Sequence, residues 1–265
     1  MKKIAFQILG SSSAGNCSVL RTPKCTVLID AGFTGKKIAE NLAELGLSLS
    51  DIDAIFFTHE HRDHCEGMRA LSHESEIRFF ANRGTAEQIN LRFSRRIAWN
   101  LFETGTRFEF GDLRVTTFAI PHDASDPVGY VFECGETAGT AERVAWLTDC
   151  GKITGVVRRA LADVDALVLE ANYDERMLSN SGRPPNLIQR IRGSHGHLSN
   201  DAMSDFLREY ENPRLQRLLL AHVSRECNAE TLVCNASAGA LGARRGLATF
   251  VDPFALLPAG AGWNF

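Results

Sequence analysis

The side chains of residues 58–64 constrain this chain more than any other feature of its sequence. The segment reads Thr-His-Glu-His-Arg-Asp-His and directly follows the short apolar run 54–57. Imidazole nitrogens bind zinc, manganese or iron, and a carboxylate suits the harder ions of this series. A zinc-protease helix of the HExxH type is disfavoured, because Asp63 rather than a histidine stands four residues after His59. The pattern predicts a metal site at a strand end, the alternative being a surface histidine cluster without a ligand. The candidate ligands are His59, His61, Asp63 and His64.

Composition limits the class of protein. The chain has 265 residues, of which 44% are hydrophobic, enough apolar surface for a sizeable core. It contains no run of about 18 uncharged apolar residues, and residues 4–9 are too short for the apolar part of a signal peptide. Its seven cysteines lack CxxC spacing, which is typical of reduced thiols. We expect one cytoplasmic domain over residues 1–265 with no membrane segment; a homo-oligomer is compatible with the sequence.

Apolar runs separated by turn residues predict the secondary structure. Strands are expected at residues 4–9, 17–21, 26–30, 54–57, 78–81, 107–110, 113–120, 127–134, 144–148, 166–170 and 215–221. Helices are expected at residues 35–45, 65–72, 84–90, 153–161 and 200–211, the last with Asn200 as its N-cap. Each half has strands followed by helices, which predicts an α/β fold of two sheets packed face to face with helices outside, a four-layer sandwich. The serine- and glycine-rich segment 10–16 is either a hairpin connection or a phosphate cradle.

Single candidate ligands directly follow three other predicted strands. They are His122, Asp149 and His222. A loop-borne site is commonly built at such strand ends, although a lone aspartate there is most often a turn or cap residue. Asp30 also ends a strand, and we expect it to make structural hydrogen bonds near the site rather than to bind metal.

Charge is unevenly distributed along the chain. The net charge is −3, which does not indicate nucleic-acid binding. Residues 176–200, however, contain no Asp or Glu and carry four arginines, Arg176, Arg183, Arg190 and Arg192. This stretch is either a solvated loop or a surface that contacts phosphates.

Taken in order, the motif, the three later ligands and the segment 28–32 resemble the metallo-β-lactamase-fold hydrolases over nearly the whole chain. The resemblance implies an αββα sandwich that holds two divalent ions, zinc, manganese or iron, at one edge. The first ion would be bound by His59, His61 and His122, the second by Asp63, His64 and His222. Asp149 would bridge the two ions.

Further segments resemble the bacterial YycJ/WalJ-type exonucleases, a subgroup related to ribonuclease Z. They are residues 10–16, 126–130, 169–172, 196–200 and 221–228, and the chain departs slightly from the subgroup's pattern at residues 226–228, where Cys227 replaces an Asn. The resemblance implies a DNA exonuclease of 5′-to-3′ direction in which a metal-bridging hydroxide attacks the phosphate. Its site residues would include Asp63, which orients the hydroxide.

The comparison with ribonuclease Z implies roles for two more residues. His197 would donate a proton to the leaving oxygen, and Glu170 would hold its imidazole in the correct tautomer. Without that comparison, a helix-entry residue is the better interpretation of His197. Two other functions stay open: hydrolysis of small cyclic or linear phosphodiesters, and a non-catalytic regulatory protein with a structural metal. The second is weakened because a closed structural zinc site needs about four ligands and this chain offers more.

Overall fold

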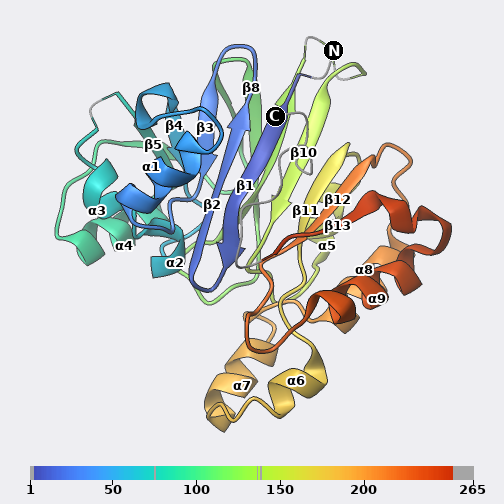
Figure 1. Ribbon diagram of the computed structural model, residues 1–265. Coiled ribbons are helices and arrows are strands. Elements are labelled where there is room, and N and C mark those ends of the chain that lie inside the picture. The colour runs from blue at the N-terminus through green and yellow to red at the C-terminus, as the bar shows by residue number, and fades with distance from the viewer. Residues whose placement is uncertain (1–2, 75, 136, 138, 253–265) are drawn as a thin grey trace.

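The computed structural model describes residues 3–74, 76–135, 137 and 139–252, and these residues form two β-sheets packed face to face (Figure 1). The first sheet has the strand order β1-β2-β3-β4-β5-β6 and the second β13-β12-β11-β10-β9-β8-β7. The first comprises β1 Ala5–Ser12, β2 Gly15–Arg21, β3 Thr26–Ile29, β4 Ala54–Phe56, β5 Arg78–Asn82 and β6 Trp99–Phe102. The second comprises β7 Arg107–Phe110, β8 Leu113–Ala119, β9 Val128–Cys134, β10 Glu142–Leu147, β11 Ala166–Glu170, β12 Arg217–Ala221 and β13 Ala248–Phe250.

Helices cover the outer face of each sheet (Figure 1). Those beside the first sheet are α1 Gly35–Ala43, α2 Arg62–Cys65, α3 Met68–Leu71 and α4 Arg83–Phe93, with a 3-10 turn η1 Leu49–Asp51. Those beside the second are α5 Gly155–Leu161, α8 Asn200–Glu209 and α9 Glu230–Leu241, followed by η2 Gly242–Leu247. No helix within the described ranges is both long and apolar enough to cross a bilayer.

Three apolar clusters lie between these layers, which explains why the chain stacks them. Inward-facing side chains of both sheets, Phe6, Phe56 and Tyr130 among them, form the central cluster. The outer cluster of the first sheet packs Ile55 and its neighbours against α1, α3 and α4. The outer cluster of the second sheet packs Leu167 and its neighbours against α5, α8 and α9. Because the central strands are covered on both faces, they read as continuous apolar runs.

Strand direction brings the carboxyl ends of many strands to one edge of the sandwich. Strands β3 to β6 run parallel to one another, and so do β10 to β13. Strand β8 runs antiparallel to β9, which runs antiparallel to β10, so β8 points the same way as β10. Residues that follow these strands in the chain therefore meet at that edge.

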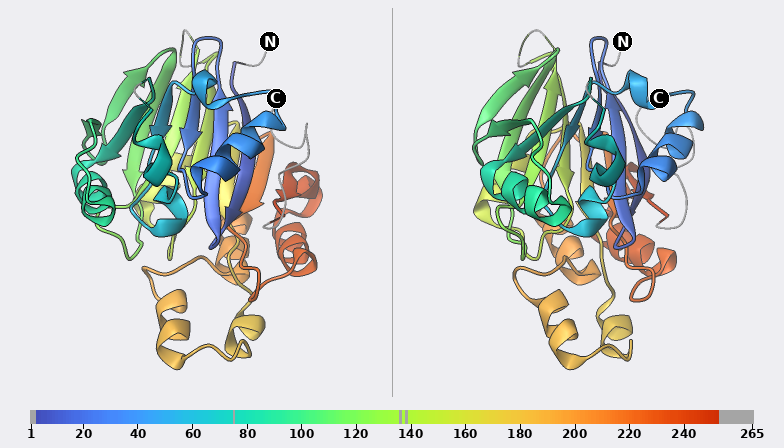
Figure 2. Two further views of the ribbon diagram at one scale, coloured as in Figure 1. Left: turned by 60° about the vertical axis from the view of Figure 1, so that its left-hand side comes forward. Right: turned by 90° about the vertical axis from the view of Figure 1, so that its left-hand side faces the viewer.

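A pair of short helices extends beyond this edge (Figure 2). They are α6 Glu175–Ser179 and α7 Pro185–Arg192, which we call the α6–α7 arm. The arm has its own small apolar cluster, in which Leu178 and Ile191 pack with Cys227. The loop interpretation of residues 176–200 is therefore wrong for both helices.

Strand β1 reaches Ser12 and β2 begins at Gly15, so segment 10–16 is mostly a tight antiparallel hairpin, in agreement with the hairpin interpretation. Other expectations need correction. The helix expected at 65–72 is broken into α2 and α3 at Gly67, whose Cβ position would lie 2.9 Å from the carbonyl oxygens of Ala31 and Phe33. The N-cap of α8 is Ser199, whose hydroxyl accepts the Ala202 N–H. The sequence did not predict β6, α9 or β13.

Candidate metal centre

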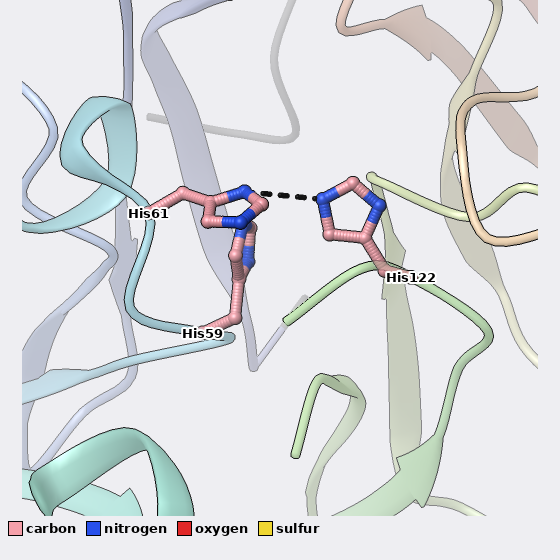
Figure 3. A group of neighbouring side chains, drawn as sticks. All are labelled: His59, His61 and His122. Atoms are coloured by element: carbon pink, nitrogen blue, oxygen red, sulfur yellow. Dashed lines mark hydrogen bonds between the residues drawn. The ribbon is translucent and has the colours of Figure 1, made fainter. Parts of the chain in front are cut away.

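The residues predicted as ligands lie together at the common edge of the two sheets. His59 and His61 lie in the loop after β4, and Asp63 and His64 belong to α2. His122, Asp149 and His222 follow β8, β10 and β12. In Figure 3, His59 and His61 from the first sheet face His122 from the second.

Three of these strand ends have an unusual backbone. Asp30, Asp149 and His222 have φ angles of 59°, 57° and 54°, in the left-handed region that non-glycine residues rarely occupy. Such conformations cost free energy and persist where surrounding contacts impose them. At each position the chain turns sharply where a strand ends, and the polar side chain is buried at the centre.

Hydrogen bonds to the protein fix which nitrogen of each histidine faces the centre. Nδ1 of His122 donates to the carbonyl oxygen of Gly196 at 3.0 Å, which leaves Nε2 free. Nε2 of His61 lies 3.3 Å from the carbonyl oxygen of Asp123, which leaves its Nδ1 free. The two free nitrogens face each other at 3.2 Å. Metal-binding histidines are typically oriented by such a bond from the opposite ring nitrogen.

The same arrangement holds for the other three histidines. Nδ1 of His64 donates to the Asp30 carboxylate at 2.8 Å. Nδ1 of His222 lies 3.0 Å from the Asn16 side-chain oxygen. Nδ1 of His59 lies 3.0 Å from the Thr58 hydroxyl, which itself donates to the Asp30 carboxylate and so accepts from the imidazole. Nε2 of His59 and of His222 is left for another partner, whereas Nε2 of His64 lies 3.0 Å from the Asn16 side-chain nitrogen.

Asp149 lies at the middle of the group. Its Oδ1 is 3.1 Å from Nε2 of His222 and 3.6 Å from Nε2 of His122. Its Oδ2 is 3.2 Å from Nε2 of His64. One carboxylate therefore contacts histidines from both sheets, as a ligand shared between two ions would.

Several of these atoms are buried without a hydrogen-bond partner. Among the described residues, they include Nε2 of His59, Nε2 of His222 and Oδ2 of Asp149, the last two because their close contacts lack hydrogen-bond geometry. An unpaired buried polar atom is costly, and native proteins rarely contain several of them side by side. Two cations, one beside His59 and one beside His222, would satisfy these atoms with Asp149 common to both groups, so the donor set fits divalent metal.

The electrostatics of His59 and Asp149 agree with the same interpretation. Burial lowers the pKa of His59 well below its usual range, so its imidazole is neutral and able to ligate. Burial would raise the pKa of Asp149, but the imidazoles of His222 and His64 reverse this and hold it well below its usual range. The carboxylate is therefore ionised.

The donor atoms fall into three groups of close neighbours. One contains His59, His61 and His122, and another contains His59, His64 and Asp149. The third contains Asp149, Glu170, His197 and His222. Asp63 belongs to none of them; its Oδ2 lies 3.6 Å from Nε2 of His64, and its side chain is 25% exposed.

Glu170 and His197 form a hydrogen-bonded pair beside this group. Nδ1 of His197 lies 2.8 Å from Oε1 of Glu170, whose Oε2 accepts the Cys150 N–H at 2.7 Å. Burial lowers the pKa of His197, but Glu170 and then Asp149 raise it to about 9. His197 is therefore protonated near neutral pH. Its Nδ1 lies 3.7 Å from Oδ1 of Asp149.

A cavity of about 200 Å³ opens over the metal centre, which we call the central cavity. Its walls include His197 and His222, Arg190 of α7, and Arg183 from the link between α6 and α7. Both arginines have acidic partners far along the chain: Arg190 pairs with Asp123, and Arg183 lies 2.8 Å from Glu226. The absence of acids within residues 176–200 therefore did not leave these charges unpaired.

Two polar residues of the site have no role in the sequence-based prediction. Asn16 contacts Nε2 of His64 and Nδ1 of His222 through its carboxamide. Asp123 joins the His61 and His122 loops to the arm through Arg190. Asp123 directly follows a predicted ligand, and Asn16 ends the segment 10–16, but neither position is informative without the fold. Asp30 makes the structural hydrogen bonds expected of it.

Comparison with known families agrees with the fold and the site. The family described as “Beta-lactamase superfamily domain” matches residues 25–223. The chain therefore belongs to the beta-lactamase superfamily, and the αββα sandwich expected from the sequence is confirmed.

Within that superfamily, the chain is similar to proteins named as exodeoxyribonucleases. It is 33% identical to exodeoxyribonuclease WalJ of Streptococcus pneumoniae serotype 2 over 238 residues, which cover 88% of this chain and 87% of the relative. It is 28% identical to exodeoxyribonuclease YycJ of Bacillus anthracis, with 86% and 85% covered. Among solved structures, the metallo-β-lactamase-fold protein YhfI of Bacillus subtilis matches with a TM-score of 0.71 at 14% identity, covering 95% and 97% of the two chains.

Proposed function

We propose that this protein is a metal-dependent phosphodiesterase that acts on DNA. The observation that carries the proposal is the convergence of five histidines, each with one ring nitrogen held by the protein and the other turned toward Asp149 or its neighbours. The relatives named as exodeoxyribonucleases support DNA as the substrate, and the 5′-to-3′ direction follows from the resemblance alone.

Two divalent ions, zinc, manganese or iron, fit the donor set. The first would be held by His59, His61 and His122, the second by Asp63, His64 and His222, with Asp149 between them. When bound, such ions activate water for attack and stabilise charge on the scissile phosphate. A position for Asp63 at the rim of the site also suits a role in orienting the attacking water.

The Glu170–His197 pair supplies the proton that the leaving oxygen needs. The hydrogen bond from Nδ1 of His197 to Glu170 leaves Nε2 as the donor atom, and His197 lines the central cavity. The Glu170 carboxylate favours the protonated form of this imidazole, which suits the ring to donate a proton. Glu170 acts by positioning this ring.

The decisive experiment loads the protein with zinc or manganese and supplies end-labelled single- and double-stranded DNA, with bis(p-nitrophenyl) phosphate as a small diester. We expect stepwise release of mononucleotides, lost by at least about 100-fold on chelation and restored by metal. Hydrolysis of the small diester without degradation of DNA would replace this proposal with the small-phosphodiester function. Stoichiometric metal without turnover of either substrate would leave a structural site.

We also propose a reducing, cytoplasmic compartment. The seven cysteines, all within the described residues, are free thiols. Mass spectrometry of alkylated protein from cells would contradict this if it found disulfides.

A further inference from the structure

A second cavity adjoins the metal centre on the side of the β1–β2 hairpin. It measures about 520 Å³, within the usual size of small-ligand sites, and we call it the Phe33 cavity. It shares Ser13, at the hairpin turn, and Asp63 with the central cavity. The two cavities therefore meet at Asp63, and a substrate lying across the centre has room on both sides of it.

The Phe33 ring is rigidly held. A Cβ added to Gly10 or to Gly15 would lie 2.4 Å from the ring, so the two glycines let it rest directly on the hairpin backbone. Gly32 is equally constrained, because its Cβ position would lie 1.7 Å from the Asp63 carbonyl oxygen. A half-buried aromatic ring fixed in this way, on the wall of a cavity, is a suitable surface for stacking a base.

Two exposed cations also line the Phe33 cavity. Lys37 of α1 lies 3.9 Å from Glu40, with 52% of its side chain exposed. Arg62 of α2 lies 3.0 Å from Glu66 and is 73% exposed. Exposed pairs within one helix are weak, so a phosphate can take the place of either carboxylate. Glu66 is further neutralised by Arg69, 3.2 Å away.

We propose that the Phe33 cavity binds the nucleotide adjacent to the scissile phosphate in a single nucleic-acid strand. Its base stacks on Phe33, and its phosphate lies against Lys37 and Arg62. A base within a duplex does not present its face to a side chain, so this site selects unpaired strands or frayed ends. The inference rests on the proposed nuclease function and adds to it the strandedness of the substrate.

The test compares Phe33→Leu and Lys37→Gln with Lys36→Gln, a matched control whose side chain is 88% exposed and lies outside the cavity lining. Leucine preserves the apolar packing on the hairpin and removes the aromatic face. Each variant is assayed on a single-stranded oligonucleotide and on bis(p-nitrophenyl) phosphate. Binding of a labelled phosphorothioate strand of about eight nucleotides is measured by fluorescence anisotropy.

We expect Phe33→Leu to weaken strand binding and raise its KM by about tenfold, with the small diester unaffected. Lys37→Gln should flatten the dependence of log Kd on log salt by about 0.7, and Lys36→Gln should match the wild type. Wild-type affinity and salt dependence in both cavity variants, with DNA still degraded, would overturn the strand site alone. An equal loss on both substrates would also overturn it, because the effect would then be on the metal centre. A wild-type protein that neither binds nor cleaves the strand would overturn the nuclease function together with this site.

Discussion

The metal centre and the α6–α7 arm border the same cavity, yet their polar side chains are organised differently. At the centre, each ring is held by a backbone carbonyl, hydroxyl, amide or carboxylate partner, and Nε2 of His59 and of His222 is buried. On the arm, the Arg190 side chain is 60% exposed and pairs with Asp123, whose side chain is 29% exposed. The centre is therefore preorganised for a cation, whereas the arm carries exchangeable pairs that a phosphate can enter.

The largest expected effect comes from removing the carboxylate at the middle of the centre. Asp149→Ala should lower kcat/KM by roughly 10³-fold on DNA and on bis(p-nitrophenyl) phosphate, and should reduce bound metal measured by mass spectrometry. Asp205→Ala, at a side chain 72% exposed, is the control. Full turnover by Asp149→Ala would show that the centre does not act as a unit.

A smaller effect, restricted to one substrate, is expected at the proton donor. His197→Ala should slow DNA cleavage by about 100-fold, because the leaving sugar oxygen needs a proton. The p-nitrophenolate leaving group does not, so bis(p-nitrophenyl) phosphate should lose under about tenfold. Glu170→Gln should also slow DNA cleavage more than hydrolysis of bis(p-nitrophenyl) phosphate, with both losses smaller than in His197→Ala. Equal losses on both substrates would assign His197 to metal binding instead.

The arm should affect binding more than turnover. Arg190→Gln is expected to raise the KM for DNA about fivefold, with kcat nearly unchanged. The slope of log KM against log salt concentration should become shallower by about 0.7. Arg192, which pairs with Glu175 and does not line the central cavity, supplies the control Arg192→Gln. A fall in kcat for Arg190→Gln would mean that the arm positions the metal centre. The arm would then contribute to turnover as well as to phosphate binding.

The smallest effect is expected at Arg176, an exposed residue of α6 that lines neither cavity. Arg176→Gln should change KM by less than about twofold, since a single distant charge is largely screened at physiological salt. Steady-state kinetics at low and moderate salt would check this. A fivefold effect at moderate salt would extend the substrate path along the outer face of the arm.

The same contrast explains what the sequence could and could not predict. Buried parallel strands are recognisable as apolar runs, so the residues that follow them, such as His122 and Asp149, could be proposed as one group before any fold was known. Short helices such as α7, with one buried residue in eight, have no such signal. Charge pairing was misjudged for a related reason: the partners of Arg183 and Arg190 lie outside the segment, and only the fold brings them near.

The placement of Asp149 has a mechanical consequence. It follows a strand of the second sheet, as do His122 and His222, whereas His59, His61 and His64 follow a strand of the first. A cation bound by ligands from both sheets links the two sheets to each other. Its binding free energy adds to the free energy of unfolding. At a concentration of about a thousand times Kd that contribution is about 4 kcal/mol. Loss of metal would then loosen the joint between the two sheets as well as stopping the chemistry.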